Sequence, residues 1–308
     1  LFYDRRLSLN NTFSCAMCHI PEQGFTSNEM ATAVGFEGRT VRRNSPTIHN
    51  TAYLSRLFHD GREYSLEQQV WGPLLAPNEM ANPSVGAVIR KLRGLPDYEG
   101  LFEAAFDGRS AGMETLGMAL ANYERTLLSA DSPFDRWYFG GEQDALGEAE
   151  RRGFGLFTGK AGCCHVVGKD TALFTDNDLH NTGVGYRESM LDEPPTREVS
   201  VAPGIVLKVP GSVISSVSER PPNDLGLYEI TQNPDDRWKY RTPALRNVAL
   251  TAPYMHNGSL RSLREVVEFY NEGGVLNEVL DRRGRPRSLG RSEERGVGQG
   301  CRSRWAPY

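Results

Sequence analysis

The sequence predicts a mainly α-helical protein that folds as two small helical domains. The chain has 308 residues, which is long for one compact helical core and suits two domains of ordinary size. Apolar residues recur at helical spacing in several segments, and no segment shows a competing strand alternation. Two clusters of cysteine and histidine lie far apart, and each falls in a different half of the chain. A duplicated helical unit explains all three observations.

Composition and charge exclude several classes of protein. Hydrophobic residues make up 39% and charged residues 24% of the chain, as in folded, soluble proteins. The net charge of -4 argues against a nucleic-acid partner. No apolar run reaches the length needed to span a bilayer. The chain opens on Leu1 without the segments of an export signal, so any signal has been removed or lies outside this numbering.

Helices are expected at three places in the first half. Ser65 and the three residues after it form a capping box that opens a short helix. Segment 84–93 carries its apolar residues on one face, and a glycine and a proline follow it. Segment 116–127 carries a second apolar stripe at helical spacing.

The segment 129–141 is predicted to join the two domains, because it is rich in proline, glycine and aromatic residues. The domains are therefore expected at 1–140 and 141–308. A further helix over 145–157 leads into the second cysteine cluster. The end of the chain, 282–308, is rich in arginine and glycine and is expected to form an irregular tail.

The first cluster predicts a covalently bound haem. Cys15, Cys18 and His19 form the pattern C-x-x-C-H. Two thiols at this spacing reach both vinyl groups on one edge of a porphyrin, and the adjoining histidine supplies the proximal iron ligand. A redox C-x-x-C pair would not need the histidine. A c-type haem on a cytochrome c-like helical domain is therefore expected here.

The second cluster is a damaged version of the same pattern. Cys163, Cys164 and His165 are adjacent, so the first cysteine is not at the usual spacing. Either the haem is held by one thioether, or two residues are missing from the sequence, or these are two buried thiols beside a core histidine. Both haem interpretations keep His165 as the proximal ligand. The fifth cysteine, Cys301, stands alone near the end of the chain.

Several segments resemble the bacterial di-haem cytochrome c peroxidase family, and within it the MauG-like branch. The match runs from the first residues to about Gly274. The resemblance implies two cytochrome c-like domains, two c-type haems, hydrogen peroxide as a reactant and a periplasmic location. The segments that carry it are L-S-L-N-N-T from Leu7, N-S-P-T from Asn44, F-H-D-G-R from Phe58, G-P-L-L from Gly72, D-L-H-N-T-G from Asp178, T-P-A-L-R-N from Thr242 and Y-M-H-N-G from Tyr254.

The resemblance also implies a peroxide pocket over the first haem. Glu79 stands at the family's distal acid position, with Gln69 and Pro73 at the MauG-like spacing. Peroxidases of the family carry a distal histidine soon after the proximal one, but here the next histidine after His19 is His49. The first haem is therefore expected to be open to peroxide. Glu79 would move a proton between the two peroxide oxygens, Gln69 would orient the peroxide, and Pro73 would limit the pocket.

The distal ligand of the second haem separates the two branches of the family. Peroxidases use a methionine, whereas MauG-like proteins use a tyrosine, and the family spacing places this position on Tyr270. Tyr270 shares a predicted helix face with Leu263 and Val267 and is expected to point inward. Met255 is the competing ligand. The residue between the haems is normally tryptophan but here is His59, which carries an oxidising equivalent less readily.

A calcium ion is also expected. The resemblance implies a calcium ion between the domains, bound by the side chain of Asn44 and the carbonyl groups of Thr251 and Pro253.

Three functions remain open. A MauG-like enzyme would oxidise tryptophan or tyrosine residues of a partner through high-valent Fe(IV) haems. A cytochrome c peroxidase would reduce peroxide with electrons from a small cytochrome or cupredoxin. The third function is non-enzymatic electron transfer. Trp71, Trp137 and Trp238 are candidates for electron hopping to the surface.

Overall fold

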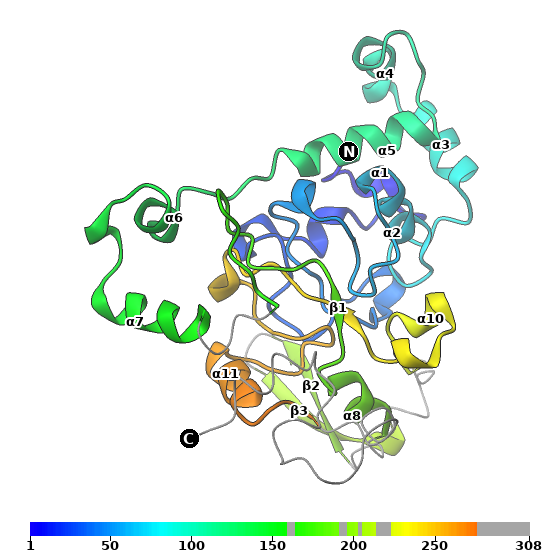
Figure 1. The fold of residues 1–308 in the computed structure, drawn as a ribbon. Coiled ribbons are helices and arrows are strands. Elements are labelled where there is room, and N and C mark those ends of the chain that lie inside the picture. The colour runs from blue at the N-terminus through cyan, green and yellow to red at the C-terminus, as the bar shows by residue number, and fades with distance from the viewer. Residues whose placement is uncertain (159–163, 191–195, 203–204, 214–222, 276–308) are drawn as a thin grey trace.

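The fold is mainly helical, with long loops between short helices, in a computed structural model (Figure 1). Cys163, Cys301 and the predicted tail 282–308 lie outside the residues that the structure describes. The described residues are 1–158, 164–190, 196–202, 205–213 and 223–275.

Helices dominate both halves of the chain. Their order in Figure 1 runs from blue and cyan in the first half to green, yellow and orange in the second. The α-helices are α1 Leu66–Gln69, α2 Trp71–Leu75, α3 Val85–Arg93, α4 Leu101–Ala105, α5 Met113–Arg125, α6 Pro133–Tyr138, α7 Glu148–Leu156, α8 Val184–Met190, α10 Tyr228–Thr231 and α11 Leu263–Asn271.

Serine caps begin the helices at the expected places. Ser65 accepts a hydrogen bond from the backbone N–H of Gln68 and opens α1. Ser84 opens α3 in the same way, and Gly94 ends it. On α5, Leu116 and Leu120 are fully buried and pack into the main core of the first half. The three expected helices are confirmed, although at Ser65 the structure gives the serine cap alone and not the reciprocal bond of a capping box.

Strands form where none was expected. β1 (Leu179–His180) pairs antiparallel with β4 (Tyr240–Arg241), and β2 (Thr196–Ala202) forms an antiparallel hairpin with β3 (Ile205–Pro210). The expectation that no strand competes with the helices was therefore wrong. The β-branched residues Thr196, Val199 and Val201 of β2 and the valines and isoleucine of β3 favour strands, but both runs are short.

The predicted junction 129–141 contains a helix. Ser132 and Asp135 form a capping box around Pro133, which begins α6. A helix also follows as expected, although α7 begins at Glu148. Figure 1 shows α6 and α7 at one side of the molecule, away from α3 and α4. The domain boundary at residue 140 stays a prediction.

The second half repeats the local structure of the first at a constant spacing. In each half a left-handed asparagine precedes a 3-10 turn. An isolated antiparallel bridge then joins Leu57 to Glu63 in the first half and Tyr254 to Leu260 in the second. A serine-capped helix follows each bridge. Equivalent residues are Ser45 and Thr242, Asn50 and Asn247, Phe58 and Met255, His59 and His256, Gly61 and Gly258, Ser65 and Ser262, and Pro73 and Tyr270.

The two halves meet through reciprocal hydrogen bonds between equivalent positions. The backbone N–H of Asn44 donates to the carbonyl of His256 at 2.7 Å. The backbone N–H of Arg241, which is the equivalent of Asn44, donates to the carbonyl of His59 at 2.7 Å. Such an exchange is what an approximate twofold relation between the halves produces. The predicted duplication is therefore visible in the contacts as well as in the motifs.

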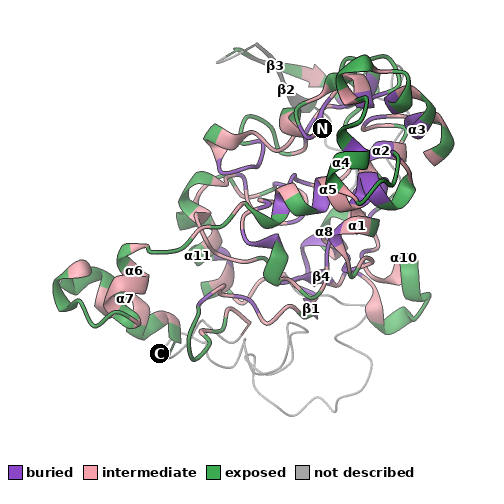
Figure 2. Cartoon of the chain, turned by 90° about the horizontal axis from the view of Figure 1, so that it is seen from above, coloured by how far each residue is buried: buried purple, intermediate pink, exposed green. Residues whose placement is uncertain are grey.

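Burial is concentrated in the first half. Figure 2 shows purple, buried residues under α2 and α5, whereas α6 and α7 are pink and green. No helix among the described residues has the length and apolar character required to cross a membrane.

Candidate haem sites and peroxide pocket

A cavity of about 320 Å³ in the first half brings together most of the predicted site. Cys15, Cys18 and His19 line one part of it, and Gln69, Pro73 and Glu79 line another. The cysteines lie in and beside a single 3-10 turn. The other three residues come from α1, α2 and the turn after α2. The volume falls in the range of cofactor pockets.

His19 is oriented as a proximal haem ligand. Its Nδ1 donates to the carbonyl oxygen of Phe25 at 3.0 Å. This hydrogen bond fixes the ring and the tautomer, so Nε2 keeps the lone pair that iron requires. Phe25 adopts a left-handed backbone with φ 57°, and the side chain of the next residue, Thr26, donates to the carbonyl of Ser45. The loop around the ligand is therefore held on both sides.

Glu79 faces the same cavity from the turn after α2. The carbonyl of Glu79 accepts from the N–H of Phe36 at 3.1 Å, which fixes its backbone. A Cβ on Gly35 would meet the carbonyl oxygen of Asn78 at 2.1 Å, so only glycine allows this close approach. Burial raises the pKa of the Glu79 carboxyl, against a smaller lowering by Arg62. A carboxyl with a raised pKa holds its proton more tightly than an exposed one, which suits a group that accepts a proton and returns it.

Arginines give the cavity a positive side that suits the two propionates of a haem. Arg43, Arg62 and Arg241 all line the cavity. Arg43 is held by Asp60 at 2.6 Å and by Asp224 at 2.6 Å. Thiols at one side, an oriented imidazole and fixed guanidinium groups are together the donor set that a c-type haem requires.

His59 lies in the cavity lining at the contact between the halves. Its Nε2 donates to the carbonyl of Asn44 at 2.9 Å. Burial lowers the pKa of His59 to about 4, so its ring is neutral at physiological pH. A bridging role of His59 between the haems stays a prediction, and a neutral imidazole oxidises less readily than indole.

Glu124 was missed by the sequence analysis. It is buried on α5, lines the same cavity, and burial raises its pKa to about 7. Glu124 follows Leu120 by four residues, so its carboxyl lies on the apolar face of that helix. A charged residue on an apolar face was the sequence signal that could have identified it.

The second site keeps the proximal arrangement of the first. The Nδ1 of His165 donates to the carbonyl of Phe174 at 2.8 Å, and Phe174 adopts the same φ of 57° as Phe25. The hydroxyl of Thr175 donates to the carbonyl of Thr242 at 2.7 Å, which repeats the bond between Thr26 and Ser45. His165 therefore fits a haem ligand by the same criterion as His19.

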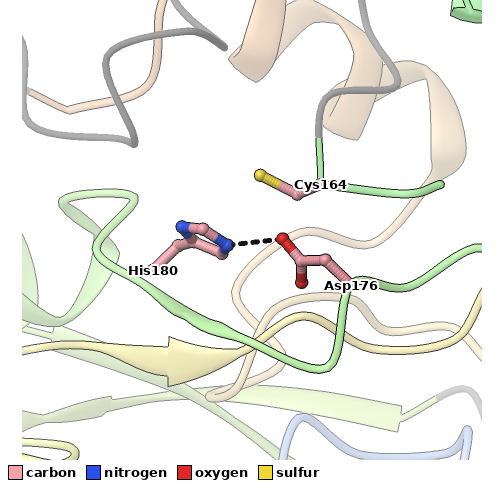
Figure 3. A group of neighbouring side chains, drawn as sticks. All are labelled: Cys164, Asp176 and His180. Atoms are coloured by element: carbon pink, nitrogen blue, oxygen red, sulfur yellow. Dashed lines mark hydrogen bonds and ion pairs between the residues drawn. The ribbon is translucent and has the colours of Figure 1, made fainter.

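Cys164 lies among acidic and imidazole groups. Figure 3 shows Cys164, Asp176 and His180 facing one another, with ligand atoms within 4.8 Å of each other. His180 Nε2 lies 2.8 Å from a carboxylate oxygen of Asp176. Burial, with Asp176 and Asp178, raises the pKa of the Cys164 thiol to about 12. The thiol is therefore protonated until it reacts or binds a cation.

Tyr270 and Met255 occupy different parts of the repeat. Tyr270 is the equivalent of Pro73, which lines the first cavity beside Gln69 and Glu79. Met255 is the equivalent of Phe58, which also lines that cavity, so both stay candidates. Tyr270 is half-buried.

The expected inward face of α11 was wrong. Leu263 is 39% and Val267 56% exposed, and the buried residue is Phe269. The helix packs by Phe269, and the ring of the half-buried Tyr270 lies 5.2 Å from the Phe269 ring. An exposed apolar face beside a half-buried tyrosine suits a wall of a haem pocket.

Of the three predicted calcium ligands, Asn44 lies at the contact between the halves, where its backbone N–H donates to the carbonyl of His256. Asn44 is buried, and its Nδ2 donates to the carbonyl of Ala31 at 3.1 Å, which leaves Oδ1 to accept or to bind a cation. Thr251 and Pro253 follow the left-handed Asn247. Calcium at these residues stays a prediction.

Comparisons with known proteins agree with this geometry. Residues 1–144 match the di-haem cytochrome c peroxidase family. Methylamine utilization protein MauG of Methylorubrum extorquens is 36% identical over 298 residues, which cover 96% of this chain and 73% of the relative. Cytochrome-c peroxidase IdrP1 of a Pseudomonas species is 37% identical and covers 89% of this chain and 70% of the relative.

Solved structures show the same fold. A MauG-like protein associated with microbial copper homeostasis superposes with a TM-score of 0.70 at 31% identity, over 97% of this chain and 78% of that chain. The di-haem peroxidase BthA of Burkholderia thailandensis gives a TM-score of 0.68 at 26% identity, over 88% and 69% of the two chains. With oriented histidines in both halves, the chain belongs to the di-haem cytochrome c peroxidase family, in its MauG-like branch, and is an oxidoreductase with two haems.

Proposed function

We propose that the protein uses hydrogen peroxide to oxidise tryptophan or tyrosine residues of a partner protein. The observation that carries this proposal is the convergence of Gln69, Pro73 and Glu79 on the cavity that holds His19. The histidines among the described lining residues are His19 and His59, and His59 Nε2 is engaged with Asn44. The described lining thus offers no third histidine that could close the site above His19, which supports access for peroxide.

The haems, when bound, supply the redox centres that accept the two oxidising equivalents of peroxide. Glu79 takes a proton from the near oxygen of peroxide and returns it to the far oxygen, which leaves as water. Gln69 donates a hydrogen bond that orients peroxide, and Pro73 limits the space around it. His19 is held by Phe25, so the proximal side does not move during these proton transfers.

Tyr270 favours use of the oxidising equivalents over simple removal of peroxide. An anionic oxygen ligand stabilises an oxidised iron centre, whereas a methionine ligand raises its reduction potential. A large partner side chain cannot enter a cavity of about 320 Å³ together with a haem, so it must be oxidised by electron transfer across the protein surface. A periplasmic location agrees with covalent haem attachment, and calcium at Asn44 would stiffen the contact between the halves.

A cytochrome c peroxidase is the second candidate. His59 in place of tryptophan favours it, because the two haems would then share oxidising equivalents less readily. Turnover of peroxide with a reduced small cytochrome, fast and without prior reduction of the enzyme, would support this candidate over the first. Slow turnover with that donor, together with covalent oxidation of a partner, would support the first.

Replacement of Glu79 tests the peroxide chemistry. Glu79→Gln keeps the shape of the side chain and removes the proton acceptor, so both haems should bind while peroxide cleavage slows by about 10²-fold or more. Stopped-flow spectra of the diferric protein after peroxide addition measure the rate. Glu114→Gln, at an exposed position on α5, is the matched control. An unchanged rate in Glu79→Gln would remove Glu79 from the mechanism.

A further inference from the structure

A cluster of aromatic rings connects the second haem site with the molecular surface. Phe134 on α6 is its centre. The Phe134 ring lies 5.1 Å from the ring of Phe174 on one side and 5.3 Å from that of Tyr138 on the other. The rings of Phe134 and Tyr138 are stacked, with an interplanar angle of 12°. Phe154 on α7 packs against both, at 5.1 Å and 5.5 Å.

The inner end of this cluster contacts the iron ligand. Phe174 is the residue whose carbonyl accepts the hydrogen bond from His165 Nδ1 at 2.8 Å. Phe157 adds a second contact, because its ring lies 6.4 Å from the imidazole of His165 and 6.2 Å from Phe174. Two ring contacts, Phe174 to Phe134 and Phe134 to Tyr138, therefore separate the ligand's hydrogen-bond partner from the surface.

An ion pair fixes α6 in this position. Arg246 donates to both carboxylate oxygens of Asp135 at 2.6 Å, and its Nε donates to the carbonyl of Ala172 at 2.6 Å. The guanidinium of Arg246 also lies over the Phe174 ring, 5.6 Å from its centre. A bidentate pair of this kind restricts orientation as well as distance. Arg246 therefore fixes both α6, which carries Phe134, and the ring of Phe174.

The outer end of the cluster is a phenol that reaches solvent. Tyr138 is 45% exposed, and Trp137 beside it is half-buried, with its ring 5.8 Å away. Phenol and indole are much easier to oxidise than the phenylalanine ring. The phenylalanines therefore act as a packed medium for electron tunnelling, and the oxidisable residues stand at the surface.

We propose that Tyr138 is the residue through which electrons from a donor enter the second haem. Tyr138 loses one electron towards the haem, and its phenolic proton passes to bulk water. A one-electron donor at α6 then reduces the tyrosyl radical, which takes a proton back from water. Two such cycles supply the two electrons that, with two protons, reduce one hydrogen peroxide to two waters. The proposal rests on the peroxide reaction proposed above, and it adds the residue at which electrons from the donor enter the protein.

Peroxide without any donor tests this assignment on the diferric holoenzyme, because the protein's own side chains must then supply the electrons. Freeze-quench EPR detects the radical, and peptide mass spectrometry locates oxidised residues. Tyr138→Phe preserves the stacked ring and removes the phenol. Tyr53→Phe, at a 60% exposed tyrosine of the first half, is the matched control. We expect loss of the tyrosyl signal in Tyr138→Phe and no change in Tyr53→Phe.

A second variant tests the path itself. Phe134→Leu leaves Tyr138 in place and removes the ring between it and Phe174, so the tyrosyl signal should form several-fold more slowly while peroxide is consumed at the wild-type initial rate. If peroxide is consumed and Tyr138→Phe gives the same signal and oxidised peptides as Tyr53→Phe, the assignment of Tyr138 is wrong and the proposed function stands. If the wild-type protein does not react with peroxide, the proposed function fails and the assignment falls with it.

Discussion

Glu79 and Glu124 are two buried carboxyl groups of the first cavity. Burial raises the pKa of both, but the expected consequences differ. Glu79 lies beside Gln69 and Pro73, where peroxide is expected. Glu124 lies on α5, and its charge also raises the pKa of the Cys15 thiol, after the larger effect of burial. Burial penalises the charged form of each carboxyl. In the proposed mechanism this penalty helps Glu79 to accept a proton and return it, whereas for Glu124 it is a cost to folding.

Glu124→Gln should therefore stabilise the protein at alkaline pH. The unfolded carboxyl loses its proton near pH 4.5, whereas the folded one holds it to about pH 7. The folded state thus binds more protons between these values, and stability falls as the pH rises through this window. Glutamine removes the loss, which amounts to about 3 kcal/mol at pH 8 and little at pH 4.5.

Urea unfolding of the two proteins at pH 5 and pH 8 measures this difference. Glu114→Gln on the exposed face of α5 should show no comparable gain. Equal stability of Glu124→Gln and the wild type at pH 8 would show that the Glu124 carboxyl is ionised without cost.

At the scale of helices, the contact between α1 and α5 positions one wall of the peroxide pocket. Gly117 on α5 faces α1 so closely that a Cβ would lie 2.7 Å from the carbonyl oxygen of Glu67. Glu67 is also paired with Arg125 of α5 at 2.7 Å. Since Gln69 is on α1, any displacement of α1 moves the side chain that is expected to orient peroxide.

Gly117→Ala should lower both stability and peroxide reactivity. The added methyl group must push two backbones apart, which costs about 1–3 kcal/mol, and the shift of α1 moves Gln69 in the pocket. Gly153→Ala on α7 is the control, because a Cβ there meets nothing within 4 Å and should stabilise by about 0.5–1 kcal/mol. Thermal unfolding and stopped-flow peroxide kinetics report the two effects. A Gly117→Ala protein as stable and reactive as the wild type would contradict this account of the helix contact.

Local sequence signals predicted the bounds of helices better than they predicted contacts with other parts of the chain. Ser84 and Gly94 bound α3 because capping and termination depend on nearby residues. The hairpin of β2 and β3 was not predicted, because two short strands contain too few residues to show a clear alternation of apolar and polar positions. The C-x-x-C-H motif located His19, but the carbonyl of Phe25 that orients it could be found only in the folded chain.

For the whole molecule, the approximate twofold relation between the halves determines which residues play equivalent roles. Asn44 and Arg241, at equivalent positions, make the same hydrogen bond to the opposite half, although one is an amide and the other a guanidinium. Asn50, His59, Gly61 and Ser65 recur as the same residue types at the equivalent positions of the second half, and matching backbone angles and bridges accompany them. The sequence showed the two cysteine clusters, whereas the equivalence of Pro73 and Tyr270 follows from the constant spacing between the matching turns and bridges of the two halves.

This equivalence leads to a prediction for the second haem. Pro73 has no side-chain atom that can bind iron, so the first haem is expected to be open, whereas Tyr270 at the equivalent position of the second half offers a phenol oxygen. Tyr270→Phe should therefore change the EPR and absorption spectra of the second haem alone and lower the yield of partner oxidation at least tenfold, while peroxide is still cleaved at the first. Pro73→Ala should change the first haem alone, and Met255→Leu should leave the ligation of both unchanged. A spectral change of the second haem in Met255→Leu but not in Tyr270→Phe would make Met255 the ligand and the protein a peroxidase of the methionine type.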